Sequence, residues 1–359
     1  MKTLLIFLSF LTSISIHSQS SLNAIDSYVC PPCNSSCDTL TFDKPGTCTH
    51  CAMPLITEKE LKEKYPKVEK KKIAFYLQSG IEILDFAGPM EVFAYADFEI
   101  FTVSKTKEPI VSQGILTILP DYNIKDAPKA DILAFFGGNA AQSFKDPEII
   151  NWIQSQPYIE YHFSVCTGVF ALANAGTLNG MTATTFHNAL DGLEKNYPEI
   201  TVVKNARFVD NGKVVTTAGI SAGIDGALHL VAKLQGFNEA RKIAYHMEYD
   251  KWTPGEGINL SPDNPYDGFI NIPNLENYTG TYEYLHNAEV ALKINARENS
   301  LYAILDKRNY PLFYLKKDEF INLNGDEITF IKDKNNEIIG YKSSRDPEII
   351  YKKLNHNNN

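Results

Sequence analysis

Basic residues are the scarcer charged class in this 359-residue sequence: 34 lysines and arginines stand against 43 aspartates and glutamates, giving a formal net charge of −9 at pH 7. A nucleic-acid binder needs a concentrated basic surface that neutralises phosphates, so this balance argues against a nucleic-acid partner. The sequence also has no run of the roughly 20 apolar residues that a membrane-spanning helix needs. Hydrophobic residues nevertheless make up 44% of the chain and charged residues 21%. We therefore expect a folded protein, long enough for two or three domains.

Residues 1–20 have the pattern of an export signal. Lys2 provides a positive start, residues 4–11 form a short apolar run, and residues 13–20 are mostly small and polar. We expect cleavage near residues 18–20 and an exported protein, periplasmic or secreted. An N-terminus that stays tethered to a membrane is the alternative.

Cysteine is rare outside one stretch. Five of the six cysteines lie between residues 30 and 51, and the sixth, Cys166, stands alone in the middle of the chain. This distribution indicates two different chemistries, one for the cluster and one for the isolated thiol.

Residues 73–247 alternate short apolar runs with amphipathic stretches. Strands are predicted at residues 73–77, 98–104, 131–136, 161–165 and 213–217, and helices at residues 168–175 and 223–234 among others. Buried strands that alternate with helices form a parallel sheet covered on both faces. The sequence therefore predicts an α/β fold, a flavodoxin-like sandwich, in which ligands bind beyond the carboxyl ends of the strands.

Cys166 directly follows one of these strands, and a small-residue helical run begins after it. This order predicts a tight elbow with the sulfur near a helix N-terminus, where the helix dipole and the N–H groups would lower the pKa of the thiol. Gly168 would let the next turn pack close to the sheet. Backbone N–H groups at Gly137, at Gly138 and after Cys166 are candidates for an oxyanion hole. Because free cysteines are commonly buried, an inert core thiol is the alternative.

Several sequence blocks of this central segment occur in the order seen in a known superfamily. They lie at residues 83–93, 131–138, 165–168, 175–180, 183–185 and 217–225. On these blocks, residues 73–247 resemble the ThiJ/PfpI superfamily, which has the class I glutamine-amidotransferase-like fold and includes Parkinson disease protein seven. The pattern is most similar to the isonitrile-hydratase-like proteins and to the sensor domain of certain AraC-type regulators.

The resemblance implies roles for particular residues. Cys166 matches the family nucleophile, Thr167 the threonine that follows it, and Asp85 the acid of the Leu-Asp-x-x-Gly-Pro block of the isonitrile-hydratase-like proteins. A carboxyl group beside a thiol shares a proton with it or is repelled by it, so Asp85 is expected to act as a general acid or base. Glu91 is the competing carboxylate, with a solvated position on a helix as its alternative role. Gly138 would help to hold developing negative charge.

Departures from the superfamily pattern narrow the chemistry. Proteases of this superfamily have a histidine directly after the cysteine, where this chain has Thr167, and the later His-x-Glu pair of the glutamine amidotransferases is missing. His229 lies in an apolar helical run, which favours a packed structural histidine. Related hydratase-like sequences read Thr-Thr-His-Trp, whereas here Phe186 and His187 occupy the last two positions, so His187 is at most a candidate wall of the pocket. Proteolysis and glutamine hydrolysis are disfavoured.

The N-terminal cysteines have the spacing of a zinc ribbon. Cys30 and Cys33 form one C-x₂-C pair, Cys48 and Cys51 form a second, and 14 residues separate the pairs. The surrounding sequence also resembles the short heavy-metal-binding domain of exported bacterial metal-efflux proteins. We predict a metal-binding module at residues 27–56 for zinc or another soft metal ion, with Cys37 as an extra thiol. Export would favour disulfides instead, and this alternative stays open.

The remaining segments are two connectors and a C-terminal domain. Residues 57–72 read as a charged linker, and residues 248–277 as a connector rich in proline, glycine and asparagine. Residues 278–354 have short alternating runs between turn residues, which predict a small antiparallel barrel or sandwich. This segment resembles the lipocalin-like module of exported serine hydrolases of the β-lactamase type. It contains no catalytic constellation, so a binding or packing role is expected.

The leading hypothesis is an exported thiol enzyme in which Cys166 attacks a small electrophile. Addition of water to an isonitrile is the first choice, and a glyoxalase- or deglycase-like activity the second. The alternative is a non-catalytic protein that binds a ligand or senses redox or metal stress. The expected partners are the electrophilic substrate and the N-terminal metal ion. The resemblance also implies a homodimer, and no cofactor is expected in the central domain.

Overall fold

The structure is a computed structural model. It describes residues 27–31, 36–65, 70–139, 143–156, 158–249, 252, 257–269, 272, 274–284, 288–295, 300–305 and 307–354. The predicted export signal and Cys33 lie outside these residues. The chain divides into two compact units, residues 1–69 and 70–359. Among the helices that are described, none combines the length and the apolar character needed to cross a membrane.

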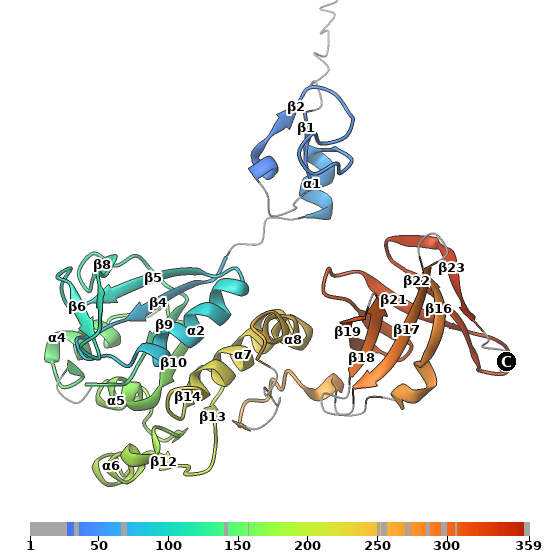
Figure 1. Ribbon diagram of the computed structural model, residues 1–359. Helices are drawn as coiled ribbons and strands as arrows, with labels where there is room; N and C mark the ends of the chain where they lie inside the picture. Colours follow the sequence, from blue (N-terminus) through green and yellow to red (C-terminus); the bar gives the residue numbers. More distant parts are fainter. Residues whose placement is uncertain are drawn as a thin grey trace, which may run out of the picture. The chain divides into compact units, whose positions relative to one another are not determined.

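The described part of the first unit is a small sheet with one α-helix (Figure 1). Its central strand β1 (Tyr28–Val29) pairs antiparallel with both β2 (Thr41–Phe42) and β3 (Ile56–Thr57). A 3-10 turn, η1 (Ser36–Thr39), precedes β2. The segment predicted as a charged linker begins with the helix α1 (Glu58–Lys64), because Thr57 and Glu60 form a capping box at its start.

The second unit begins with an eight-stranded sheet. In spatial order its strands are β15 (Ile258–Asn259), β13 (Phe208–Asp210), β14 (Val214–Thr217), β10 (Tyr161–Val165), β9 (Ile132–Phe135), β4 (Lys72–Tyr76), β5 (Glu99–Ser104) and β8 (Tyr122–Asn123). Neighbours pair in parallel except β13 with β14. That pair is antiparallel because the chain turns back within residues 211–213, too few for a crossover.

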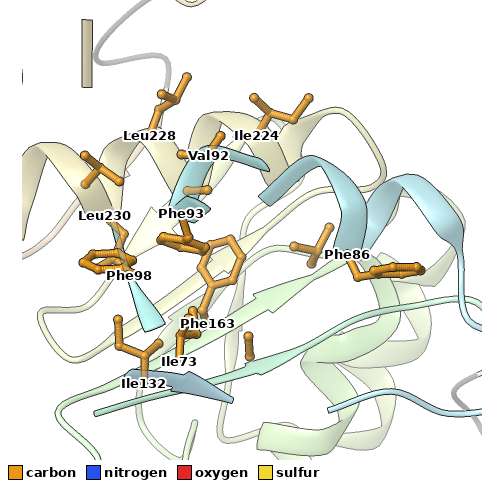
Figure 2. Close-up of a cluster of buried hydrophobic side chains, with 14 of the residues drawn as sticks. Ile73, Phe86, Val92, Phe93, Phe98, Ile132, Phe163, Ile224, Leu228 and Leu230 are labelled. Carbon is orange, nitrogen blue, oxygen red and sulfur yellow. The ribbon is translucent and has the colours of Figure 1, made fainter. Parts of the chain in front are cut away.

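Alternate residues of the strands face opposite sides of this sheet. On one side, residues such as Ile73, Ile132 and Phe163 pack under α2 (Ile83–Tyr95), α7 (Ala222–Gln235) and α8 (Phe237–His246), and Figure 2 shows this cluster. On the other side, residues such as Ala74 and Leu133 pack on α4 (Pro147–Gln154), α5 (Val169–Asn174) and α6 (Leu190–Asn196). Both faces are covered, so the predicted α/β sandwich is confirmed.

The second unit also contains several short elements. They are the strands β6 (Ile110–Ser112), β7 (Leu116–Ile118), β11 (Thr182–Ala183) and β12 (Thr201–Val202), and the 3-10 turns η2 (Cys166–Gly168), η3 (His187–Ala189), η4 (Asp267–Phe269) and η5 (Leu275–Tyr278). The predicted strand 161–165 is β10, and the predicted helices 168–175 and 223–234 correspond to α5 and α7 within one or two residues.

The C-terminal strands form a closed antiparallel barrel, which decides between the barrel and the sandwich that the sequence left open. They are β16 (Gly280–Tyr284), β17 (Ala288–Asn295), β18 (Ser300–Leu305), β19 (Arg308–Lys316), β20 (Glu319–Ile321), β21 (Glu327–Lys332), β22 (Ile338–Ser343) and β23 (Asp346–Leu354). Successive strands pair, and β23 pairs back on β16. The barrel core is rich in aromatic side chains, among them Tyr282, Phe320 and Phe330.

Helix α8 contacts the barrel strand β19. The Asn238 side chain donates to the carbonyl of Tyr314 over 3.3 Å, and the Tyr245 hydroxyl donates to the carbonyl of Asn309 over 3.0 Å. The Arg241 guanidinium lies 4.6 Å from the ring centre of Phe313. The barrel is therefore attached to the sheet domain through a helix that also belongs to the core of that domain.

Candidate active site

Cys166 lies on a strained elbow between β10 and α5. Its φ of +58° is in the left-handed region, which costs a non-glycine residue about 1–2 kcal/mol. Two hydrogen bonds hold this conformation: the Cys166 N–H donates to the Ala218 carbonyl over 3.1 Å, and the Thr185 hydroxyl donates to the Cys166 carbonyl over 2.6 Å. Strain of this kind is concentrated at functional sites. The elbow predicted from the sequence is therefore present.

Gly168 allows the elbow to close, as predicted. A Cβ atom at this position would lie 2.3 Å from the carbonyl oxygen of Phe135 in β9. Only glycine lets the start of α5 approach the neighbouring strand so closely. The turn after Cys166 is thus pressed against the sheet, and the sulfur stays at the carboxyl end of β10.

Asp85 is the carboxylate beside this sulfur, and it is fully buried in the first turn of α2. Its Oδ2 accepts the N–H of Gly137 over 2.9 Å, and its Oδ1 accepts the N–H of Ile220 over 3.0 Å. A hydrogen bond joins Asp85 to Cys166. A Cβ at Gly137 would lie 2.7 Å from the sulfur and 2.8 Å from Oδ2, so the bare backbone of Gly137 faces both groups. The structure therefore places the sulfur and the carboxylate side by side.

The electrostatics of this pair differ from the sequence-based expectation. Burial raises the pKa of Asp85 to about 6, although the N–H groups of Gly137 and Ile220 oppose the rise. Burial and the Asp85 charge together raise the pKa of Cys166 to about 12, against the N–H and hydroxyl of Thr167, which lower it. The prediction of a thiol ionised by a helix dipole is therefore wrong. The helix is short, Cys166 is only 6% exposed, and the charge that acts on its thiol is the negative charge of Asp85. At neutral pH a neutral thiol donates its proton toward a carboxylate.

The other candidate residues have separate places. Thr167 is half-buried, with its N–H and hydroxyl beside the sulfur. Glu91 is exposed on α2, so Asp85 is the carboxylate of that helix that contacts Cys166. Gly138 has a φ of +95° and bridges to Ile81, and a Cβ there would lie 2.3 Å from the carbonyl oxygen of a neighbouring glycine. Its backbone contacts by themselves require a glycine.

The N–H of Gly137 was expected in an oxyanion hole, and this expectation is wrong. That N–H is already engaged by Oδ2 of Asp85. Its bond orients the carboxylate instead of pointing at a substrate. The backbone group that lies beside the Cys166 sulfur is the N–H of Thr167, which directly follows the cysteine.

Ile220 was missed in the sequence. It has a φ of +56°, its N–H donates to Asp85, and the residue is 36% exposed. The Phe186 ring packs directly against Gly219, since a Cβ at Gly219 would lie 2.5 Å from a ring carbon of Phe186. His187 is exposed and its ring lies 4.2 Å from that of Phe186. The ring that packs against this loop is therefore Phe186 and not the imidazole.

His229 is a packed histidine, as predicted, and it belongs to a buried polar network. Its Nε2 lies 2.9 Å from Oδ2 of Asp210, and its Nδ1 lies 2.7 Å from the hydroxyl of Tyr266. The Lys233 ammonium donates to the same Asp210 oxygen over 2.9 Å. Asp210 is on β13 and both His229 and Lys233 are on α7. This network ties α7 to β13, the strand next to the edge strand β15.

A cluster of cysteines lies in the first unit. The sulfurs of Cys30, Cys37, Cys48 and Cys51 all lie within 4.8 Å of one another, and the first three residues are buried. Four thiols in such a cluster could bind a metal. Backbone N–H groups of Cys51 and His50 lower the pKa of the Cys48 thiol to about 6. Cys37, expected as an extra thiol, is a member of the cluster.

Part of the chain is similar in sequence to known proteins. Residues 71–233 match the model of the DJ-1/PfpI family. An isonitrile hydratase of Pseudomonas putida is 34% identical over 194 residues, which is 53% of this chain and 83% of that protein. The HTH-type transcriptional regulator CdhR of Pseudomonas aeruginosa is 25% identical over 169 residues, and the match spans only half of its length.

Among solved structures, a THiJ/PfpI family protein from Pseudomonas syringae is 28% identical, with a TM-score of 0.48 over 57% of this chain and 85% of that chain. The match to the hydratase covers most of that relative's length. The residues that match the family model, 71–233, include Asp85, Cys166 and the elbow between β10 and α5. The chain therefore belongs to the DJ-1/PfpI family.

Proposed function

We propose that this protein is a thiol-dependent hydratase that converts a small isonitrile into the corresponding N-substituted formamide. The observation that carries the proposal is the contact between the strained Cys166 and the buried Asp85. The similarity to an isonitrile hydratase over 83% of that protein supports the choice of substrate. Isonitriles suit this site because their terminal carbon accepts a nucleophile and a proton at the same atom.

In the first step the Cys166 sulfur bonds to the isonitrile carbon while Asp85 takes the thiol proton and passes it to that carbon. The product is a thioimidate, R–N=CH–S–Cys. A neutral thiol that already donates to a carboxylate loses its proton only as the new carbon–sulfur bond forms. The N–H of Thr167 lies beside the sulfur and stabilises its developing negative charge.

In the second step water adds to the thioimidate carbon. Asp85 takes one proton of the water and passes it to the imine nitrogen, giving R–NH–CH(OH)–S–Cys. Breakage of the carbon–sulfur bond then releases R–NH–CHO, and the sulfur recovers a proton from the hydroxyl group. One isonitrile and one water give one formamide, and the enzyme returns to its starting state.

Further assignments rest on the sequence. We propose that the protein is exported, on the pattern of residues 1–20, and that it dimerises, on the family resemblance. A 2-oxoaldehyde, attacked by Cys166 at its aldehyde carbon, is the second substrate class. We assign the barrel a binding or packing role, with the lipocalin-like resemblance as support.

Ligand binding without catalysis is a second candidate function. A cavity of about 720 Å³ is lined by residues of α7, α8 and the barrel, among them Phe237, Asn238 and Leu315. None of its lining residues belongs to the group around Cys166. A ligand that binds there without being converted would support this candidate.

The test is a panel of alkyl and aryl isonitriles and 2-oxoaldehydes, with formamide or hydroxyacid formation followed by chromatography. We expect turnover by the parent protein, loss of turnover in Cys166→Ser and Asp85→Asn, and retention in Glu91→Gln. Turnover that survives Cys166→Ser would overturn the proposal. An absence of turnover in the parent, together with saturable binding, would favour the non-catalytic function.

A further inference from the structure

Among the residues that the structure describes, four sulfurs form the cysteine cluster of the first unit, and one of them, that of Cys37, lies outside the two C-x₂-C pairs. We propose that Cys30, Cys37, Cys48 and Cys51 bind one Zn²⁺ ion as a tetrathiolate, and that Cys37 is the fourth ligand in place of Cys33. This inference is independent of the proposed hydratase activity, because it concerns a different unit of the chain.

The spacing of the sulfurs fits a tetrahedral zinc site. Four thiolates at about 2.3 Å from zinc stand about 3.8 Å from one another. The observed sulfurs lie within 4.8 Å of one another, and those of Cys30 and Cys51 are 3.2 Å apart. These separations bracket the tetrahedral value. The Cys30–Cys51 separation also exceeds the roughly 2.05 Å of a disulfide bond.

A tight turn brings two of the ligands together. The N–H of Cys48 donates to the carbonyl of Met53 over 2.8 Å, and the N–H of Ala52 donates to the carbonyl of Cys48 over 2.9 Å. Ala52 has a φ of +57°, so the chain reverses within this turn. N–H groups of His50 and Cys51 also point at the Cys48 sulfur. Such a knuckle holds both sulfurs on one side before any metal arrives.

The β1–β2 pairing supplies the other two ligands. Cys30 directly follows β1, and Val29 pairs with Thr41 at the start of β2. Because β1 and β2 are paired, the start of β2 lies close to Cys30. The turn η1, directly before β2, brings Cys37 next to Cys30. In this turn the carbonyl of Cys37 accepts the N–H of Leu40 over 3.1 Å. Six residues separate Cys30 from Cys37. A search for short C-x₂-C pairs does not select this spacing.

The chemistry of the cluster favours a soft divalent cation. Thiolates prefer zinc over calcium or magnesium, which take oxygen ligands. The cysteines also form most of the core of the unit, together with the partly buried Phe42, Met53 and Leu55. A core this small gives little hydrophobic stabilisation, so metal binding would contribute much of the folding free energy.

The experiment compares two single-cysteine variants of the full chain. The parent, Cys37→Ser and Cys33→Ser are purified with zinc present, and bound zinc is counted by native mass spectrometry. Affinity is measured by competition with a chelator. We expect one zinc per chain in the parent and in Cys33→Ser. In Cys37→Ser we expect an affinity loss larger than the roughly 10–100-fold that removal of an outer-shell partner causes.

Two further measurements distinguish the loss of a zinc ligand from a general folding defect. Cys37→His should restore zinc binding, because histidine is a zinc ligand, and this separates ligation from a general folding defect. Cadmium substitution should give a thiolate charge-transfer band that is weaker in Cys37→Ser than in the parent. Zinc lost in Cys33→Ser but kept in Cys37→Ser would overturn the proposal. So would parent protein, made in an oxidising compartment, that carries two disulfides in this cluster and no zinc.

Discussion

The backbone N–H of Ile220 donates to Oδ1 of Asp85 over 3.0 Å, although the two residues are 135 positions apart in the sequence. Ile220 adopts a φ of +56° where it makes this bond. A β-branched residue in the left-handed region is strained, and here the strain presents an N–H to the carboxylate that contacts Cys166.

Glycine at position 220 should therefore make the protein more stable than alanine there. Both substitutions remove the same partly exposed side chain beyond Cβ, but glycine adopts a positive φ without the roughly 1–2 kcal/mol cost of an L side chain. We expect the free energy of unfolding of Ile220→Gly to exceed that of Ile220→Ala by about 1 kcal/mol in denaturant titrations. Ile220→Ala keeps the strain and is the control. Greater stability of the alanine variant than of the glycine variant would contradict this account.

The pH dependence of turnover should report the ionisation of Asp85. The carboxylate is the base that takes the thiol proton, and burial raises its pKa to about 6. We expect kcat/KM to rise as the pH increases through about 6 and then to level off, since the pKa of Cys166 is raised to about 12. The profile is measured from pH 4.5 to 9. A rate that falls as the pH passes 6 would show that the protonated acid is the active form.

The buried network around Asp210 should make a large contribution to stability. Although burial alone would raise the pKa of Asp210, hydrogen bonds from His229 and Lys233 hold it below its usual range. Asp210→Ala leaves Lys233 buried without this partner and should cost about 3–5 kcal/mol of unfolding free energy. Asp191→Ala, which removes a solvent-exposed ion pair with Lys204, is the control and should cost less than about 1 kcal/mol.

The same network determines whether the free energy of unfolding rises or falls as the pH is lowered. The pKa of Asp210 is lower in the folded state than in the unfolded state, so its ionised form stabilises the fold above about pH 4. This contribution is lost as the pH falls through the folded-state pKa. The difference in stability between the parent and Asp210→Asn should therefore shrink in acid. A difference that stays constant down to pH 2 would show that Asp210 acts through packing alone.

Gly168→Ala should destabilise the elbow. The added methyl would lie 2.3 Å from the carbonyl oxygen of Phe135, and overpacking of this kind costs about 1–3 kcal/mol. Gly192 is the matched control: it lies in α6 with open space around it, so alanine there should stabilise the helix by about 0.5–1 kcal/mol. Thermal unfolding of both variants gives the comparison. Equal effects of the two substitutions would contradict the close packing at Gly168.

The sequence predicted what local pattern and resemblance determine. The strand that ends at Val165 and the helix that follows Gly168 come from hydrophobic periodicity and residue size, and both lie where they were expected. The sequence left Asp85 and Glu91 as competing carboxylates because it does not show which face of α2 packs against the sheet. In the structure Asp85 is buried and Glu91 is exposed. The pKa of Cys166 was mispredicted because burial depends on packing from distant segments, which local pattern does not contain.

Features that depend on pairing between distant strands were the hardest to predict. Closure of the barrel depends on the pairing of Tyr282 with Lys353, and local alternation of residues is the same in a barrel and in a sandwich. Cys37 joined the cysteine cluster because β1 and β2 pair, a contact that the spacing of the cysteines does not encode.

Asp85 accepts N–H groups from residues 52 and 135 positions away, and Cys166 comes from a fourth segment of the chain. The surroundings that raise the pKa of this thiol thus exist only once all four segments have docked. A chain caught part-way through folding carries a thiol of ordinary nucleophilicity, open to alkylation, glutathione or a chaperone. The rate at which Cys166 becomes resistant to such reagents therefore measures the rate of the final assembly step of the sheet domain.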